Sequence, residues 1–277
     1  MIRLIASDLD GTLIGKDFRF RPRTLHALQA ARAAGIQIVF VTGRPSRWLT
    51  PIREQTDFDS YAICSNGAVI YHLGADEVEA VNGAPAHAIR SAHELLQPVF
   101  PNATYTLETV DTVYIQGPYE GGEVLEGARV VESSIAEAFV ALGDTPIIKY
   151  LVRVPGMDPD ILHVREAQTV GELVSVTRGV VGEPLIEMGS KTVNKGYTLA
   201  QFAARHGIEA HGVMAFGDMP NDAEMLCWAG RGYAMASGQP ALIEKVGRTC
   251  PPFGEDGVAQ VIEAMLQEHE EAEPRTV

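Results

Sequence analysis

Apolar residues along the chain form short continuous runs, and segments of helical composition lie between them. Residues 2–7 and 36–41 are apolar runs of the kind that is typical of strands buried on both faces. Residues 24–34, between these runs, are rich in helix formers and are followed by a glycine, a common helix stop signal. A second helix is expected from Pro45 and a third buried strand at residues 61–64. This alternation predicts a parallel sheet with helices on both faces.

The pattern changes near residue 83 and changes back near residue 189. In between, the expected order is α-β-β-α-β-α-β-β, at residues 85–99, 104–108, 112–116, 132–142, 147–153, 158–168, 172–177 and 180–187. Strands that follow one another without a helix imply antiparallel pairs, so this segment is predicted to be an α+β unit of its own.

After residue 194 the first pattern resumes. The predicted fold class is therefore α/β. A doubly wound, Rossmann-like parallel-sheet core of residues 1–83 and 189–277 is interrupted by an inserted α+β domain of residues 84–188. The end of the chain, residues 268–277, is charged and lacks apolar anchors, so we expect it to be frayed.

Composition and charge narrow the range of functions. The formal net charge of -14 argues against nucleic acid as a partner, and a small anionic substrate would need a local positive charge or a bound cation. Cys64, Cys227 and Cys250 are widely spaced, which argues against a disulfide framework or a structural zinc site. The sequence contains no apolar run long enough to cross a bilayer and no signal-peptide pattern, so we expect a cytoplasmic protein without a membrane partner.

The first candidate site is DLDGTL, residues 8–13, directly after the first predicted strand. Ligands of open α/β sheets bind at the carboxyl ends of the strands. Strand alternation places Asp8 and Asp10 on the same side, and two carboxylates so close require a cation or a shared proton. Capping of the next helix would explain one aspartate better than two. A calcium-binding EF-hand is excluded, because Arg19 stands where its twelfth-position glutamate is needed.

A second acidic cluster, GDMPND at residues 217–222, follows an apolar strand and leads into a helix. Asp218 and Asp222 lie at a helix start, where free backbone N–H groups favour anions, so capping alone would explain one of them. Together with Asp8 and Asp10 they supply the hard oxygen ligands that Mg2+ prefers. Because both clusters end parallel strands, the fold can bring them together.

Two further segments could complete a phosphate site. At the end of the second predicted strand, Thr42 offers a hydroxyl and Gly43 an unobstructed backbone N–H to a phosphate oxygen. Lys195, in the NKG segment of the returning core, could supply a point positive charge. Taken alone, an ordinary turn and a surface lysine are the simpler interpretations, so the hypothesis depends on all four segments lying together.

The segments DLDGTL, VTGR, NKG and GDMPND, in this order, resemble the four motifs of haloacid dehalogenase-like phosphatases. The long gap between Arg44 and Lys195 is similar to that of the Cof-like branch, which carries a large type IIB cap and mostly hydrolyses sugar phosphates and related metabolites. The element order predicted for the insert matches that cap. CSNGA at residues 64–68 and EDGV at residues 255–258 also resemble signatures of the branch.

The resemblance implies a role for each motif residue. Asp8 attacks phosphorus and becomes an aspartyl phosphate, while Asp10 protonates the leaving alcohol and then activates water. Mg2+ is the implied cofactor, and its implied ligands are Asp8, Asp10 through its backbone carbonyl, and Asp218. Asp222 is expected to support this metal site by orienting the metal waters or Lys195. The expected phosphate-binding residues are Thr42, Gly43, Lys195 and Asn221.

Residues that contact the substrate are expected mainly in the cap. Arg178 and Gly179, at the predicted turn between the last two cap strands, and the loop at residues 117–122 are candidates, although an ordinary turn explains each more simply. Arg44 and Asn66, next to the predicted phosphate site, are further candidates.

Three other functions stand beside phosphatase. A phosphomutase of the same fold would return the phosphoryl group to a sugar, and the motifs do not distinguish it. A nucleotide-dependent enzyme is disfavoured, because GSKT at residues 189–192 lacks the glycine before the lysine of a P-loop. A non-catalytic binding protein would be expected to lose a catalytic carboxylate.

One departure from the branch is MASG at residues 235–238, where Ser237 replaces an asparagine. The sequence leaves the substrate and the oligomeric state open.

Overall fold

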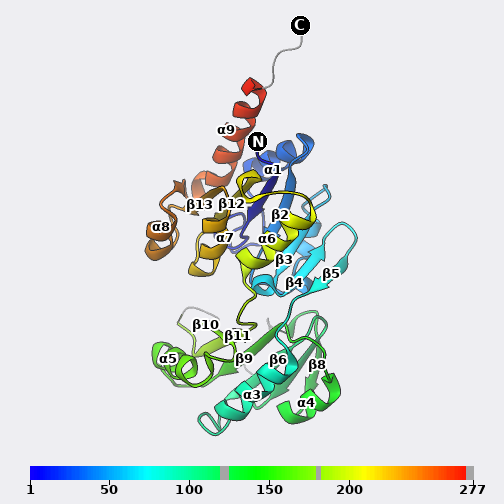
Figure 1. The fold of residues 1–277 in the computed structure, drawn as a ribbon, viewed down its shortest axis with the longest axis vertical. Helices are drawn as coiled ribbons and strands as arrows, with labels where there is room; N and C mark the ends of the chain where they lie inside the picture. Colours follow the sequence, from blue (N-terminus) through cyan, green and yellow to red (C-terminus); the bar gives the residue numbers. More distant parts are fainter. Residues whose placement is uncertain (119–124, 179–181, 273–277) are drawn as a thin grey trace. The chain divides into compact units, whose positions relative to one another are not determined.

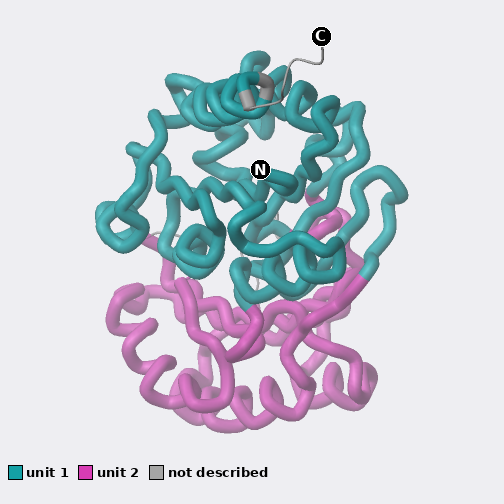
Figure 2. The backbone as a smooth tube through the Cα atoms, turned by 45° about the horizontal axis from the view of Figure 1, so that its top comes forward, with its two compact units in different colours: residues 1–44, 49–79, 194–277 teal, residues 45–48, 80–193 magenta. Residues whose placement is uncertain are grey.

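The computed structural model describes residues 1–118, 125–178 and 182–272, and the chain divides into two compact units (Figures 1 and 2). Unit 1 comprises Met1–Arg44, Leu49–Glu79 and the chain from Asn194 onward, and unit 2 comprises Pro45–Trp48 and Ala80–Val193.

Unit 1 is built on an eight-stranded sheet with the strand order β14-β13-β12-β1-β2-β3-β4-β5 (Figure 1). The strands of this sheet are β1 (Leu4–Ser7), β2 (Gln37–Val41), β3 (Tyr61–Cys64), β4 (Val69–His72), β5 (Glu77–Val81), β12 (Val213–Gly217), β13 (Arg231–Met235) and β14 (Thr249–Cys250), and the last two residues of β5 already belong to unit 2. The strands from β14 to β3 are parallel, and β4 is antiparallel to β3. Every residue of β1 and β12 is buried, as expected for strands covered on both faces.

The helices of unit 1 are α1 (Pro22–Ala33), α2 (Thr50–Arg53), α6 (Lys195–Arg205), α7 (Ala223–Trp228), α8 (Pro240–Val246) and α9 (Gly257–Ala272). Helix α1 packs against α9, and α6 packs against α7. The predicted doubly wound parallel core is confirmed.

Unit 2 is a six-stranded sheet with the order β10-β11-β9-β6-β7-β8. Its strands are β6 (Thr104–Glu108), β7 (Thr112–Gln116), β8 (Arg129–Glu132), β9 (Lys149–Arg153), β10 (Ser175–Arg178) and β11 (Leu185–Gly189). Its helices, α3 (Ala86–Leu96), α4 (Ile135–Leu142) and α5 (Pro159–Val170), bury Ile89, Ile135 and Leu162 in a common core with Tyr105 and Tyr150 of the sheet. The inserted α+β domain is thus confirmed.

The element order predicted for the insert was wrong at one position, because it omitted β8. This strand pairs parallel to β7, whereas β6 and β7 form the expected antiparallel pair. The helix predicted from residue 132 begins at Ile135, since Ser134 caps it and forms a capping box with Glu137.

Several other boundaries differ from the predictions, and the segment from Pro45 shows the reason for one of them. The helix expected from Pro45 is a 3-10 turn, Ser46–Trp48, followed by the short α2. The carbonyl of Glu126 in unit 2 accepts hydrogen bonds from the side chains of Arg47 and Trp48, so tertiary contacts override the local pattern there.

Helix α9 extends to Ala272, into the range for which a frayed tail is expected. Residues 268–272 belong to α9, where Glu268 pairs with Arg231 at 2.9 Å and His269 Nε2 accepts the backbone N–H of Ile2 at 3.3 Å, and fraying of the tail stays a prediction. Residues 273–277 lie outside the described residues.

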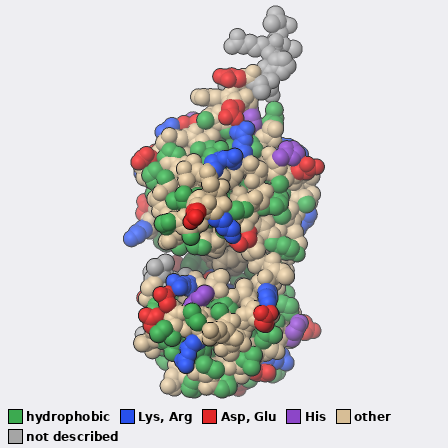
Figure 3. Space-filling view, turned by 60° about the vertical axis from the view of Figure 1, so that its left-hand side comes forward, with side chains coloured by type: hydrophobic (Ala, Val, Ile, Leu, Met, Phe, Trp, Pro, Cys, Tyr) green, Lys and Arg blue, Asp and Glu red, His purple; other side chains and the backbone are tan. Residues whose placement is uncertain are grey.

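Within the described part of the chain, none of the helices is both long and apolar enough to span a bilayer. On the face drawn in Figure 3, acidic and basic side chains are interspersed among apolar ones in both units.

Candidate active site

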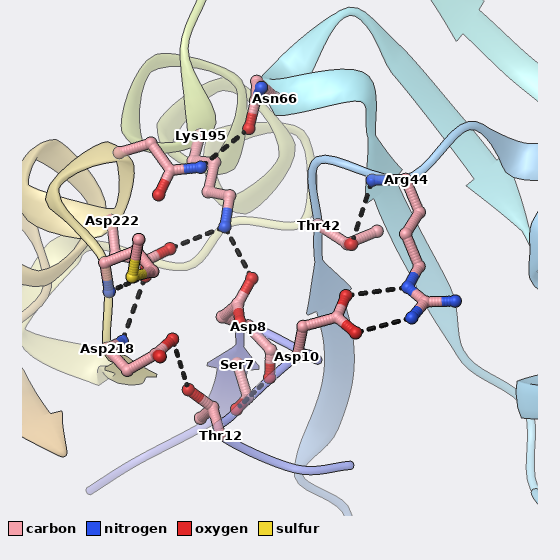
Figure 4. Close-up of polar contacts among 12 residues, drawn as sticks. Ser7, Asp8, Asp10, Thr12, Thr42, Arg44, Asn66, Lys195, Asp218 and Asp222 are labelled. Atoms are coloured by element: carbon pink, nitrogen blue, oxygen red, sulfur yellow. Dashed lines mark hydrogen bonds and ion pairs between the residues drawn. The ribbon is translucent and has the colours of Figure 1, made fainter. Parts of the chain in front are cut away.

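Four segments of unit 1 bring the predicted motifs together (Figure 4). Strand β1 lies between β2 and β12 and is parallel to both, so Asp8, Thr42 and Asp218 leave the sheet at the same edge. Asn194 caps α6 by accepting a backbone N–H of its first turn at 2.8 Å. This cap starts the helix at Lys195, whose side chain points toward Asp8.

Lys195 joins two of these segments. Its Nζ donates to Asp8 Oδ1 and to Asp222 Oδ1, each at 2.6 Å, and all three side chains are buried. Burial alone would favour the neutral amine, but the charges of Asp222 and Asp8 outweigh it and raise the pKa of Lys195. The lysine therefore stays positively charged inside the site.

The acidic groups of the site outnumber this single lysine. Burial raises the pKa of Asp8 well above its usual value, opposed by the charge of Lys195. Burial, and next the charge of Asp222, raise the pKa of Asp218 to about 6. Carboxylate oxygens of Asp8, Asp218 and Asp222 lie within 4.8 Å of one another. Such a cluster of hard oxygen donors with uncompensated negative charge fits a divalent cation such as Mg2+.

Asp222 is held by hydrogen bonds from the protein itself. Its Oδ2 accepts the backbone N–H groups of Asp218 at 3.1 Å and Met219 at 3.0 Å, while Oδ1 accepts from Lys195. A Cβ on Gly217 would lie 2.5 Å from the Asp222 carboxyl carbon, so this glycine leaves room for the carboxylate. Of the two roles expected for Asp222, these contacts favour the orientation of Lys195.

Thr12 is a residue of the site that sequence reasoning missed. Its hydroxyl donates to Asp218 Oδ1 at 3.2 Å. Gly11, with φ +80°, lies so close to Asp218 that a Cβ added to Gly11 would be 2.6 Å from Asp218 Oδ2. The position of Thr12 could have identified it. Its hydroxyl directly follows the glycine turn of DLDGTL and therefore faces the group that this turn approaches, here the Asp218 carboxylate.

The side chain of Asp10 points away from the carboxylate cluster and toward Arg44 (Figure 4). Arg44 Nε lies 2.7 Å from Asp10 Oδ2, and Arg44 Nη2 lies 2.5 Å from Oδ1. The expectation that Asp8 and Asp10 present their carboxylates together is therefore wrong for this structure. Strand β1 ends at Ser7, so strand alternation does not determine the direction of Asp10.

The other predicted phosphate residues form a second network beside this pair. The Thr42 hydroxyl accepts the backbone N–H of Arg44 at 3.1 Å. Asn66, in a left-handed conformation with φ 55°, accepts at its Oδ1 from Asn221 Nδ2 at 3.0 Å. A Cβ on Gly43 would lie 3.3 Å from the same Asn66 oxygen. The predicted residues Thr42, Gly43, Asn66 and Asn221 thus lie in one region of unit 1.

The substrate candidates of the insert lie in unit 2. Arg178 is the last residue of β10 and pairs with Asp160 at 2.7 Å, and its contact with substrate stays a prediction. Gly179 and residues 119–122 lie outside the described residues.

The MASG stretch approaches the site through its backbone. Ser237 is exposed, whereas Gly238 lies so close to Asp218 that a Cβ would be 2.7 Å from the Asp218 carbonyl oxygen. Gln239 N–H donates to that oxygen at 2.8 Å. This contact does not depend on the side chain at position 237.

A family model described as haloacid dehalogenase-like hydrolase matches residues 5–262. The chain is 26% identical to 5-amino-6-(5-phospho-D-ribitylamino)uracil phosphatase YitU of Bacillus subtilis, covering 94% of this chain and 96% of the relative. It is 27% identical to pyridoxal phosphate phosphatase YbhA of Escherichia coli, covering 95% and 98%. These matches confirm the prediction of a phosphoric monoester hydrolase.

Solved structures agree with the family over nearly the whole chain. A haloacid dehalogenase-like hydrolase from Bacteroides thetaiotaomicron has a TM-score of 0.77 at 22% identity and covers 96% of this chain and 100% of its own. A subclass IIB sugar phosphatase has a TM-score of 0.76 at 20% identity, with 95% and 98% covered. The chain belongs to the haloacid dehalogenase-like hydrolases, and its fold is similar to that of the subclass IIB sugar phosphatase.

Proposed function

We propose that the protein is a Mg2+-dependent phosphatase that hydrolyses a small phosphorylated metabolite through an aspartyl phosphate on Asp8. The observation that carries the proposal is the position of Lys195, whose Nζ lies 2.6 Å from both Asp8 and Asp222 in a buried site. A carboxylate nucleophile repels a phosphate dianion, and a buried ammonium aimed at that carboxylate lowers the repulsion.

Asp8 and Asp218 would hold the metal, with the backbone carbonyl of Asp10 as a further ligand and Asp222 in support. When bound, Mg2+ would neutralise charge on the phosphoryl oxygens as a Lewis acid. The expectation that Mg2+ fits this site rests on the clustered carboxylates, because Lys195 alone does not balance their negative charge.

The remaining chemistry belongs to two aspartates. A carboxylate oxygen of Asp8 attacks phosphorus as the bond from phosphorus to the leaving oxygen breaks, and Asp10 gives its proton to that oxygen. In the second step Asp10 takes a proton from water as the water oxygen attacks phosphorus and releases Asp8. Such acid–base work contributes roughly two to four orders of magnitude in rate. The side chain of Asp10 is 51% exposed, so water can reach it.

The phosphoryl oxygens would be bound by Thr42, Gly43, Lys195 and Asn221. A hydroxyl that accepts a bond, as Thr42 does from Arg44, still has a hydrogen to donate. The amide of Asn221 likewise has a second N–H besides the one directed at Asn66.

We infer the substrate class from the relatives, whose names include phosphatases of a phosphoribityl compound, of pyridoxal phosphate and of HMP-PP. The proposed substrate is a small phosphorylated metabolite, such as a sugar phosphate, a phosphoglycerate or a glycosyl-phosphoglycerate. Unit 2 would select among these compounds, with Arg178 as one candidate contact.

The proposal is tested by phosphate release across sugar phosphates, phosphoglycerates and nucleotides, with wild type and Asp8→Asn. We expect release by the wild type, none by the variant, loss in excess chelator and recovery with added Mg2+. Substantial turnover by Asp8→Asn would rule out the nucleophile, and full activity in chelator would rule out the metal. An isomerised product without free phosphate would identify a phosphomutase instead.

A further inference from the structure

The pair between Asp10 and Arg44 is asymmetric in its exposure. The side chain of Asp10 is 51% exposed, whereas that of Arg44 is only 14% exposed. Both carboxylate oxygens of Asp10 accept from the guanidinium, at 2.7 and 2.5 Å. Arg44 is therefore the anchored member of the pair, and Asp10 is the member whose direction it determines.

Arg44 is fixed from three directions. Its guanidinium carbon lies 4.1 Å from the centre of the Phe18 ring, its backbone N–H donates to the Thr42 hydroxyl, and its carbonyl accepts the N–H of Ser65 at 2.9 Å. A guanidinium stacked on an aromatic face keeps its plane fixed.

Phe18 occupies an unusual backbone conformation for an aromatic residue. Its φ is 58°, in the left-handed region that bulky side chains rarely adopt. Strained conformations of this kind persist where the surrounding structure requires them, and here the strained residue places its ring under Arg44.

The fork geometry holds the direction of Asp10 without covering its carboxylate oxygens. Each carboxylate oxygen has two lone pairs, and Arg44 uses one on each, so the second pair of either oxygen stays accessible to a reacting group. Without this pair, an exposed side chain would sample several rotamers and would spend less time aligned with the leaving oxygen.

We propose that Arg44 is a positioning residue for Asp10, supported by Phe18, and that it is not a substrate ligand. The proposal rests on the proposed function, in which Asp10 protonates the leaving oxygen as the bond from phosphorus to that oxygen breaks. Loss of Arg44 should then slow the reaction more for a leaving group that needs this proton than for one that leaves without it.

The test compares two substrates of similar shape, phenyl phosphate and p-nitrophenyl phosphate, in single-turnover experiments with the Mg2+-loaded enzyme. Phenoxide is the more basic leaving group and needs protonation, whereas p-nitrophenoxide leaves readily without it. We expect Arg44→Met to slow phenol release about 10- to 100-fold and p-nitrophenol release less than about 3-fold, with the KM of both substrates changed less than about 2-fold. Arg44→Lys, which keeps the charge without the fork, and Phe18→Ala should show smaller losses with the same preference.

The chain offers a matched control in Arg21. This arginine forms the same two-bonded pair with Asp256, at 2.6 and 3.2 Å, and lies 5.8 Å from the ring of Phe253. Arg21→Met should leave the ratio of the two release rates unchanged.

Three outcomes would overturn the positioning role. Equal losses for both substrates together with a raised KM would make Arg44 a substrate ligand. Faster phenol release would make the pair an inhibitory latch, and wild-type rates for both substrates would make it irrelevant to the reaction. If the wild type released neither product, or if Asp8→Asn released both, the proposed function itself would fail.

Discussion

Lys195 is buried between Asp8 and Asp222, and each of the three groups depends on the charge of the others. Burial favours the neutral form of a lysine, but the charges of Asp222 and Asp8 outweigh this effect and raise the pKa of Lys195. Removing one member leaves a buried charge without its partner, which typically costs about 3–5 kcal/mol.

We therefore expect Lys195→Met to abolish phosphate release and to lower the free energy of unfolding by about 3–5 kcal/mol, measured by urea denaturation. Lys191→Met is the control, because the Lys191 side chain is 49% exposed and pairs with the fully exposed side chain of Glu172. That variant should stay within about 0.5 kcal/mol of the wild type and should keep its activity. Unchanged stability of Lys195→Met would contradict the view that this charge holds the site together.

At the scale of elements, the turn after β1 determines whether the first and fourth motifs can meet. Gly11 adopts φ +80° and lies against Asp218, and Thr12 then donates to the same carboxylate. A side chain at position 11 would face two separate obstacles, the left-handed backbone and the Asp218 oxygen 2.6 Å from its Cβ.

Gly35→Ala allows these two effects to be separated. Gly35 has nearly the same φ, +81°, and among the described residues other than its chain neighbours nothing lies within 4 Å of the position that a Cβ would take there. Both Gly11→Ala and Gly35→Ala should lose roughly 1–2 kcal/mol of stability to backbone strain. Only Gly11→Ala should also bind Mg2+ more weakly and release phosphate more slowly, as measured by metal titration and phosphate assay. Equal activity of the two variants would show that the close approach to Asp218 has no role.

Element boundaries were predictable for some of the strands with buried residues. The strands at Tyr61–Cys64, Thr104–Glu108 and Thr112–Gln116 match their predicted ranges, because buried strands have long apolar or β-branched runs. Strand β8 was missed because it lies at an edge of its sheet and most of its residues are exposed, which removes the apolar pattern.

At the scale of the whole molecule, the two units bury acidic groups differently. Unit 1 buries Asp8 and Asp222 against Lys195, whereas unit 2 buries Glu166 of α5, and neither of its carboxyl oxygens has a hydrogen-bond partner among the described residues. Burial raises the pKa of Glu166 to about 8, so the folded protein keeps this side chain protonated at neutral pH.

The stability of the protein should therefore fall as the pH rises from about 4.5 to about 8, because the unfolded chain releases the Glu166 proton in this range and the folded chain retains it. The contribution is full below this window and is lost as the pH rises through it. Glu166→Gln cannot titrate, so its stability relative to the wild type should rise by at most about 1.4 kcal/mol per pH unit. Urea midpoints of both proteins at pH 5 and pH 8 measure the effect, and parallel changes would contradict it.

The sequence by itself determined the order of the four motifs, the strands that they follow and the family to which the chain belongs. These features follow from local patterns, since a buried parallel strand needs a continuous apolar run and the carboxyl ends of neighbouring parallel strands meet at one edge. Asp8, Lys195 and Asp218 could be expected to lie together on that basis, and the structure places them in one cluster.

Only the tertiary structure decided where the polar side chains of the site point. Asp10 turns to Arg44, Thr12 to Asp218, and Asn221 to Asn66. Each of these directions depends on a partner from another segment, and the spacing along the chain carries no information about the distance between such partners. The direction of a side chain beyond the end of a strand is set by the bonds it can form in the folded protein, so it becomes defined only when the segments have come together.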